Sequence, residues 1–364
     1  MEHSYDVLAM GRSSIDLYAN EIGAPFAEVK SFSAYVGGSP TNICVGARRL
    51  GLRTALLTAV GDDLVGEFVL DFLRREGIAV EFSPRKAGRR TSAFMLAIQP
   101  PDKFSIVPYR DNCADLELTA DDVRAAPLAA SRALLVTGSG LSREPSRAAT
   151  LFAAETARAG GGRVVLDLDV RAELWPDMRA YAEGIRAILP LTDVVIGTAE
   201  EVAAAVTPAG APAVAARPKA AELAGAAFDD ALRNGDELRN GGELRNGVAL
   251  REGVALREGV AELLAAGSAE ALVVKRGALS TFVCLRGGET IEAATFPVEV
   301  LNVLGAGDAF AGGFLYGYLK GWDWRRAARM GNACGAIVVT RHGCANFMPY
   351  EQEALAFIQE RGGF

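Results

Sequence analysis

The sequence predicts an α/β fold in which a doubly wound, mainly parallel sheet is flanked by helices and carries a small β-sheet lid. Short β-branched runs alternate with helical patterns along the chain, which is typical of βαβ units. One further pair of such runs is separated by a turn signal instead of a helix. Of the 364 residues 50% are hydrophobic, which suffices for a buried core, and we interpret residues 1–364 as a single domain.

Six short apolar runs are expected to form the parallel strands of the main sheet. Each lies between segments with helical patterning, as in successive βαβ units. In chain order they are residues 7–10, 54–58, 133–136, 164–166, 194–196 and 272–274.

A hairpin is predicted between two of these units. Residues 91–98 and 104–109 are strand-like, and the Gln-Pro-Pro-Asp-Lys segment between them contains a turn signal. Together with the segment after the first strand, this hairpin is a candidate lid formed by residues 16–36 and 90–112. An antiparallel edge extension without a functional role is the alternative.

Residues 232–261 consist of five tandem six-residue units, such as Leu-Arg-Glu-Gly-Val-Ala. A period of six matches neither a helix nor a strand, and a glycine in each unit disfavours helix by about 1 kcal/mol. We interpret residues 205–262 as a low-complexity surface insertion. A short solenoid is the alternative, although five narrow units offer little core.

Composition argues against several classes of partner. A net charge of −7 and a pI near 5.2 provide no cationic field for nucleic acid. No uncharged apolar stretch approaches the roughly 20 residues that span a bilayer, so no membrane partner is expected. The N-terminus carries acidic residues instead of the basic region of a signal peptide, which predicts a cytoplasmic protein.

The cysteines and histidines do not form a recognisable catalytic or metal-binding pattern. The five cysteines contain no C-x-x-C pair, and we expect free buried thiols. The two histidines are His3, in the N-terminal tail, and His342, which we interpret as a packing residue. Carboxylates are therefore the first candidates for acid–base chemistry.

The segment 302–314 carries the strongest functional signal. A strand-like stretch, 297–301, precedes it, and apolar residues at helical spacing follow it. The small residues Gly305, Ala306 and Gly307 at the start of this helix allow backbone N–H groups to approach a phosphate. We expect an anion hole here.

Asp308 lies within the same helical turn and is the candidate catalytic base. A carboxylate in that position can accept the proton of a hydroxyl that attacks the phosphoryl group. A helix cap is the alternative role for Asp308. Walker and Rossmann nucleotide motifs are both excluded, because Phe310 stands where each requires a glycine.

Two upstream segments are candidate sugar contacts. The twin glycines Gly37 and Gly38 expose backbone for close approach of a ligand, and Asn42 offers both donor and acceptor groups to a hydroxyl. Asp16 follows the first strand, where ligands of parallel sheets bind.

These segments, in this order, resemble the ribokinase-like (PfkB) carbohydrate kinase family over nearly the whole chain except residues 205–262. The resemblance implies a doubly wound domain with a β lid, ATP as phosphoryl donor, and Mg²⁺ with a monovalent cation such as K⁺ as activator. It also allows a homodimer.

The resemblance assigns roles residue by residue. It makes Asp308 the base, Gly305 to Gly307 the anion hole, and Asp16, Gly38 and Asn42 sugar contacts. The residues that it places on the nucleotide side are Glu200, Lys275, Gly277 and Asn332. Val303-Leu304 replaces the usual Asp-Thr, and Gly197 replaces the Asn of Asn-x-x-Glu, so the metal ligands stay open.

Within the family, the stretches 11–18, 109–115, 331–336 and 341–345 are most similar to kinases that phosphorylate the terminal hydroxyl of a sugar acid. Arg110 and Arg171 are candidates to bind its carboxylate in a bidentate manner. Alternatively, Arg171 contacts an ATP phosphate, or either arginine forms a structural ion pair. Other substrates (2-dehydro-3-deoxygluconate, fructose or ribose) and a catalytically silent sugar- or nucleotide-binding protein stay open.

Overall fold

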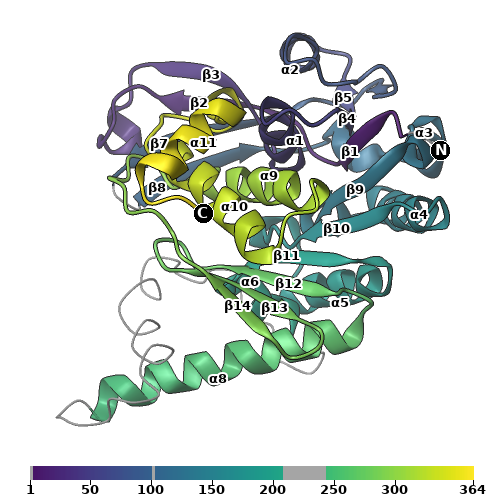
Figure 1. Cartoon of the computed structure of the whole chain (residues 1–364). Coiled ribbons are helices and arrows are strands. Elements are labelled where there is room, and N and C mark those ends of the chain that lie inside the picture. The colour runs from purple at the N-terminus through teal and green to yellow at the C-terminus, as the bar shows by residue number, and fades with distance from the viewer. Residues whose placement is uncertain (1–2, 101–102, 208–242) are drawn as a thin grey trace.

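The computed structural model describes residues 3–100, 103–207 and 243–364, and an eight-stranded sheet lies at its centre (Figure 1). The strand order is β14-β13-β12-β11-β10-β9-β1-β4, and the strands from β12 to β4 are parallel. All six predicted parallel strands are confirmed. Their bounds are β1 Tyr5–Met10, β4 Thr54–Leu57, β9 Ser131–Thr137, β10 Arg163–Asp167, β11 Val194–Thr198 and β12 Ala271–Lys275; the antiparallel edge is β13 Thr281–Leu285 and β14 Thr290–Ala293.

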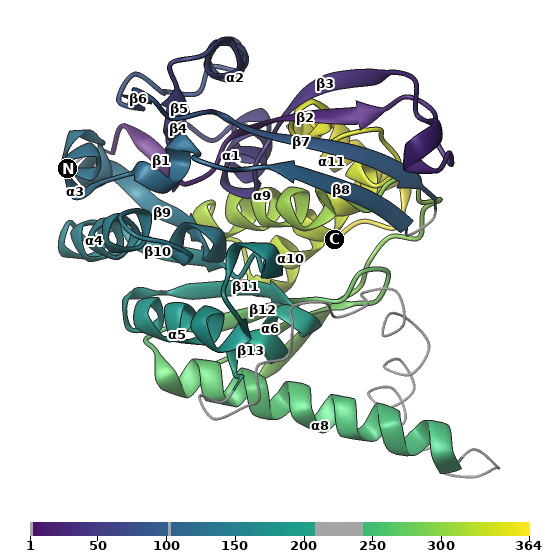
Figure 2. The same cartoon turned by 180° about the vertical axis from the view of Figure 1, so that it is seen from behind.

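Helices cover both faces of this sheet because both faces are apolar. Alternate residues of one strand enter different cores: Ala9 belongs to one and Leu8 to the other. The first face carries α1 Ser39–Arg49, α2 Leu64–Arg75, α9 Ala306–Leu319, α10 Trp324–Val338 and α11 Glu351–Glu360 (Figure 1). The second face carries α3 Ala120–Ala125, α4 Ser146–Ala159, α5 Met178–Ile188, α6 Ala199–Ala205 and α8 Glu243–Ala266 (Figure 2). This arrangement confirms the doubly wound fold class.

A second, four-stranded sheet projects from the main body (Figure 2). It contains β2 Ser14–Ala19, β3 Phe32–Gly37, β7 Ser92–Gln99 and β8 Lys103–Tyr109, in the order β3-β2-β7-β8. Strands β7 and β8 are antiparallel, as the hairpin prediction requires. A third, two-stranded sheet pairs β5 Val60–Gly61 with β6 Arg85–Lys86.

The small sheet is fastened to the C-terminal loop. The Tyr18 hydroxyl and the Cys344 sulfur are 2.9 Å apart. His342 Nε2 donates to the Ala19 carbonyl at 2.9 Å, and the Tyr35 hydroxyl donates to His342 Nδ1 at 3.1 Å, a tautomer that follows from these partners. His342 therefore links the small sheet to the C-terminal loop through both ring nitrogens.

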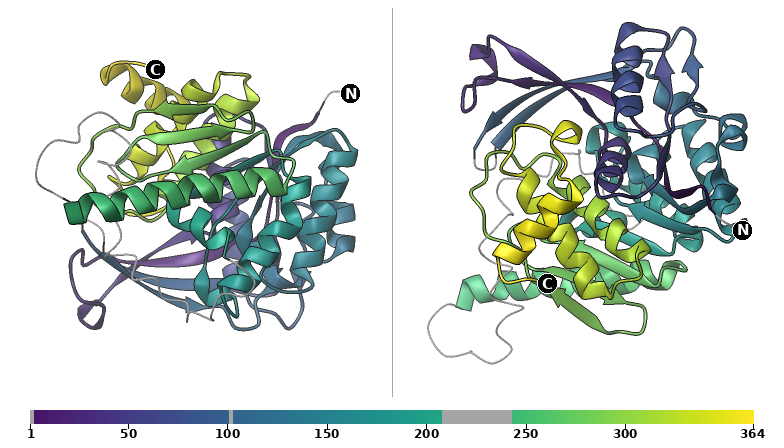
Figure 3. Two further views of the ribbon diagram at one scale, coloured as in Figure 1. Left: turned by 90° about the horizontal axis from the view of Figure 1, so that it is seen from below. Right: turned by 45° about the horizontal axis from the view of Figure 1, so that its top comes forward.

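The last repeat units form part of a helix, so the expectation that glycine prevents helix is wrong for residues 243–261. Tertiary packing offsets the glycine cost, because Val260, Leu263 and Leu264 of α8 are buried in the second core. Gly259 also lets α8 approach α6, since a Cβ there would lie 3.2 Å from Val202 Cγ1. Seen from below, α8 runs across the middle of the view, in front of the rest of the structure (Figure 3, left). The first units, within residues 208–242, lie outside the described residues.

The expected strand at residues 297–301 is absent, and this segment is an irregular connection. Pro297 has no N–H for a sheet ladder, and the N–H groups of Leu301 and Asn302 donate to Val339 O at the end of α10 instead. Throughout the described ranges, no helix combines the length and apolar character needed to cross a membrane. All five cysteines are free, and all except Cys284 are buried.

Candidate active site

The site lies where the parallel strands end. Parallel strands bring their carboxyl ends to one edge, so the segments after β1, β10, β11 and β12 meet there. The small sheet continues directly from the segment after β1, and the first turn of α9 belongs to the same region (Figures 1 and 2).

Gly305 starts α9 in a conformation that glycine adopts without strain. Its φ is +82°, and a Cβ there would lie 2.6 Å from the Cys344 sulfur. No side chain caps the helix, so the N–H groups of its first turn lack the partners that a cap provides. The arrangement is therefore able to accept an anion at Gly307 and its neighbours.

Asp308 does not cap α9. Its Oδ1 accepts a 2.8 Å hydrogen bond from Ser39 Oγ, and its Oδ2 accepts a 2.7 Å bond from Asn42 Nδ2. Both donors belong to the first turn of α1, so α1 orients the carboxylate. Burial raises the pKa of Asp308 above its ordinary value, while the bonds from Asn42 and Ser39 oppose the rise. A raised pKa makes this carboxylate a stronger base than an ordinary aspartate.

Asp16 is a second buried carboxylate near Asp308. It accepts a 2.7 Å hydrogen bond from Ser14 Oγ. Burial raises the pKa of Asp16 to about 6, and the charge of Asp308 contributes to the rise. Asp16 and Asp308 are thus both buried carboxylates with raised pKa values.

Close packing explains the two glycines before α1. A Cβ on Gly37 would lie 2.0 Å from Asp16 Oδ2. Gly38 has a φ of +105°, and a Cβ there would lie 2.3 Å from the carbonyl oxygen of Arg12. Glycine at both positions lets the segment before α1 pack directly against Asp16 and the backbone of Arg12. Direct contacts of Gly37 and Gly38 with a sugar stay a prediction.

Three arginines surround this region, and only two of them were singled out in the sequence. Arg110 donates to Asp115 Oδ2 at 2.7 Å and to Ser92 Oγ at 3.0 Å. Arg171 lies 2.9 Å from Asp169 Oδ1. The third, Arg12, is buried and lies 4.8 Å above the Phe94 ring. No local pattern distinguishes Arg12 from a surface arginine.

Lys275 lies beside the first turn of α9. A Cβ on Gly307 would be 3.1 Å from Lys275 Nζ, which places the ammonium group next to the candidate anion hole. Lys275 Nζ donates to Asp167 Oδ2 at 3.0 Å, and both side chains are buried. Burial raises the pKa of Asp167, although Lys275 opposes the rise. Asp167 and Asp169 follow a predicted strand, and that position was the available signal for them.

Glu201, rather than Glu200, faces the buried side of α6. Glu201 is buried and accepts hydrogen bonds from the N–H groups of Thr198 and Val170, at 2.8 and 3.2 Å. Glu200 is exposed on the same helix. A nucleotide contact by Glu200 stays a prediction.

Gly277 and Asn332 occupy the side of the site that includes β13 and α10. Gly277 has a φ of +61° in the turn after β12. Asn332 accepts from Thr281 Oγ1 at 2.7 Å and donates to the carbonyls of Ala293 and Ala294 at 3.1 and 2.9 Å. Asn332 thus joins α10 to the edge strands, and its contact with a nucleotide is untested.

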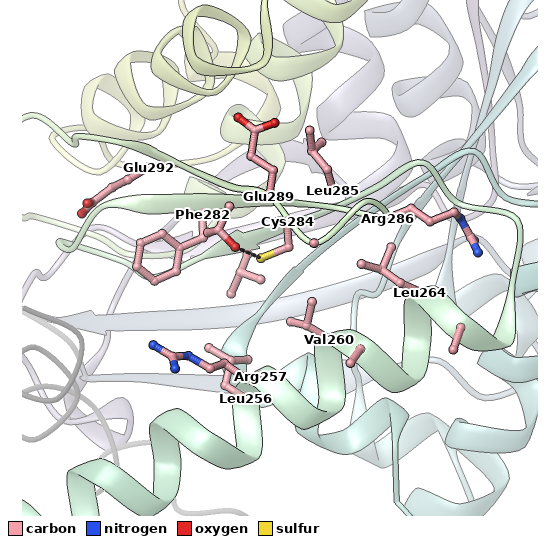
Figure 4. A pocket seen from close by; sticks show the side chains of 15 residues that line it. Leu256, Arg257, Val260, Leu264, Phe282, Cys284, Leu285, Arg286, Glu289 and Glu292 are labelled. Carbon is pink, nitrogen blue, oxygen red and sulfur yellow. Dashed lines mark hydrogen bonds between the residues drawn. The ribbon is translucent and has the colours of Figure 1, made fainter. Parts of the chain in front are cut away.

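A separate pocket of about 690 Å³ lies between α8 and the strands β13 and β14 (Figure 4). Leu256, Val260 and Leu264 of α8 face Phe282 and Cys284 across it. None of the predicted site residues lines this pocket.

Comparison with known proteins shows which protein family the chain matches. A family model described as pfkB family carbohydrate kinase matches residues 5–230 and 250–351. The chain belongs to this family. The predictions of a PfkB kinase and of a ribokinase-like fold are thereby confirmed.

Curated relatives of this pfkB kinase share nearly its full length. A protein of Shouchella clausii, named 5-dehydro-2-deoxygluconokinase, is 31% identical over 98% of this chain and 96% of its own length. A protein of Geobacillus thermodenitrificans with the same name is 32% identical over 97% and 93%. A Vibrio cholerae fructokinase double mutant, solved with fructose, ADP and potassium ion, has a TM-score of 0.74 at 22% identity and covers 98% of this chain and 99% of its own. That structural likeness shows the shared fold.

Proposed function

We propose that this kinase transfers the γ-phosphoryl group of ATP to the terminal C6 hydroxyl of 5-dehydro-2-deoxy-D-gluconate. The observation that carries the proposal is Asp308, a carboxylate of raised pKa in the first turn of α9, beside Lys275. The names of the two full-length relatives support this particular substrate.

Asp308 acts as the general base. Ser39 and Asn42 each occupy one carboxylate oxygen, and each oxygen keeps capacity to accept the proton of the C6 hydroxyl. The hydroxyl oxygen then bonds to the γ-phosphorus, the bond from that phosphorus to the β–γ bridging oxygen breaks, and ADP leaves. Asp308 holds the proton at the end of the step.

Positive groups on the other side of Asp308 stabilise the phosphoryl group. The first-turn N–H groups of α9 and the Lys275 ammonium point to the same region and favour developing negative charge there. Asp167 keeps Lys275 in position through the 3.0 Å hydrogen bond.

One carboxylate oxygen fits a magnesium ion. Asp169 Oδ2 is buried and has no hydrogen-bond partner among the described residues. A Mg²⁺ ion that accompanies a nucleotide is commonly bound by only one or two carboxylates of the protein. Mg²⁺ bound with ATP neutralises phosphate charge. Asp169, with Glu200 as the second candidate, would hold it.

The small sheet acts as a lid that excludes water from the reaction. Its strands β2 and β7 carry Asp16 and Phe94 at the site, while Tyr18 and Tyr35 anchor it to the C-terminal loop. We also propose K⁺ as an activator, a cytoplasmic location and a homodimer. A comparison of turnover in potassium and sodium buffers tests activation by K⁺, and gel filtration tests the homodimer.

The proposal is tested by ADP release with Mg²⁺-ATP and four substrates: 5-dehydro-2-deoxygluconate, 2-dehydro-3-deoxygluconate, fructose and ribose. The highest kcat/KM is expected for the first. A higher value for any other sugar would overturn the substrate, and sugar binding without ADP release would overturn the kinase activity.

A further inference from the structure

Arg12 is a buried cation that forms no ion pair with any described residue. Its exposed fraction is 8%, and no described residue forms a hydrogen bond or ion pair with its guanidinium. Its Nε is buried and lacks a hydrogen-bond partner. An unpaired buried charge is costly, so a fold retains one where a ligand supplies the opposite charge.

Arg12 is held in place at its guanidinium and at its backbone. Its carbon lies 4.8 Å above the ring of Phe94, on strand β7 of the small sheet. Its backbone carbonyl accepts a 3.0 Å hydrogen bond from Thr41 Oγ1 of α1, and Gly38 leaves no room for a side chain against that carbonyl. Arg12 therefore contacts both the lid, through Phe94, and the main body, through Thr41.

Each of the two neighbouring arginines has a carboxylate partner of its own. Arg110 is paired with Asp115, and Arg171 is paired with Asp169. Asp16 accepts its hydrogen bond from Ser14. Burial lowers the pKa of Arg12 and the charges of Arg110 and Arg171 lower it further, while the carboxylates of Asp169 and Asp16, which lie beyond ion-pair distance from Arg12, oppose the shift. All three arginines would attract a small anion from outside the chain. Of the three, Arg12 is the one that has no ion-pair partner to give up when it binds this anion.

We infer that Arg12 binds the carboxylate of the sugar-acid substrate and determines the preference for an acid over a neutral sugar. The inference rests on the proposed function. A guanidinium matches a carboxylate through two parallel N–H···O bonds, which a lysine cannot reproduce. Arg110 and Arg171 then contribute flanking positive charge, with their own carboxylate partners retained.

The test combines Arg12→Gln and Arg12→Lys with 5-dehydro-2-deoxygluconate and its neutral methyl ester. With Arg12→Gln we expect KM for the acid to rise about 10- to 100-fold, the range for loss of charge-assisted hydrogen bonds, and KM for the ester to change less than about threefold. KM for ATP should stay the same. Arg361→Gln, at an exposed arginine that also stacks on a phenylalanine, is the matched control.

Thermal melting of the ligand-free variants separates binding from packing. Removal of an unpaired buried charge should leave the melting temperature of Arg12→Gln equal to or above that of wild type. A lower melting temperature with equal losses for acid and ester would assign Arg12 to packing and overturn the inference.

Three further results would each overturn the inference about Arg12, and they differ in what they imply for the proposed function. Unchanged KM for the acid in Arg12→Gln would overturn the inference and leave the proposed function intact. A selective rise in KM for ATP would assign Arg12 to phosphate and also overturn it. If wild-type enzyme releases no ADP with the acid, the proposed function itself fails, and the inference fails with it.

Discussion

Asn42 donates a 2.7 Å hydrogen bond to Asp308 across 266 positions of sequence. This contact joins the first turn of α1 to the first turn of α9, and so it brings the two glycine-rich segments into one site. It also stabilises the ionised form of Asp308, because a carboxylate accepts the hydrogen bonds from Asn42 and Ser39 more strongly than the protonated acid does.

Asn42→Ala should therefore shift the acidic limb of the pH–kcat profile to higher pH. The hydrogen bond lowers the pKa of Asp308, so its loss leaves burial to raise that pKa further. We also expect kcat at neutral pH to fall about 10- to 100-fold through lost positioning. A profile with an unchanged acidic limb would contradict the role of Asn42.

Asp308→Asn should lower kcat about 10²- to 10⁴-fold, the usual contribution of a general base. Binding of ATP, measured by calorimetry, should change little, because the first-turn N–H groups of α9 and Lys275 are retained. Near-normal turnover in this variant would remove Asp308 from the mechanism.

Wild-type turnover should decline on the acidic side at a higher pH than an ordinary aspartate would predict. The base is active when ionised, and burial raises the pKa of Asp308, so a larger fraction is protonated at any given acidic pH. Asp16 also takes up a proton near pH 6. A pH–kcat/KM profile that stays flat to pH 4 would contradict both assignments.

Asp16→Asn should stabilise the ligand-free protein at pH 8. The pKa of Asp16 rises on folding from 3.8 to about 6, so the folded state binds more protons between these values and stability falls as pH rises through them. This rise in the pKa corresponds to a cost of at most about 3 kcal/mol at pH 8, which asparagine avoids. Urea unfolding at pH 4 and pH 8 measures the difference in unfolding free energy between the variant and wild type. The gain in stability should appear at pH 8 and shrink at pH 4. An equal gain at both pH values would refute the linkage between protonation of Asp16 and folding.

Gly305→Ala should cost more stability than Gly321→Ala. Both glycines have positive φ, +82° and +75°, so alanine is strained by about 1–2 kcal/mol at either position. Only at Gly305 would the new Cβ also meet the Cys344 sulfur, whereas nothing lies within 4 Å of it at Gly321. Equal changes in the free energy of unfolding would show that the Cys344 contact relaxes at no cost.

Much of the fold was predictable because its signals are local. Buried runs such as 194–196 and 272–274 carry strand patterning within a few residues, and the turn between β7 and β8 is encoded by adjacent prolines. The helix over residues 243–261 was not predictable from its six-residue period, because the burial of Val260 and Leu264 against the second core sustains it.

By itself, the sequence predicted the six parallel strands, the β7–β8 hairpin and the small-residue helix start that contains Asp308, since each depends on neighbours in the chain. Tertiary structure decided which charges meet. Glu201, not Glu200, faces inward because successive residues of a helix point about 100° apart, and α6 begins at Ala199. Arg12 stays unpaired because folding directs Asp115 to Arg110 and Asp169 to Arg171. Such pairing is set by contacts between distant segments, which no local pattern contains.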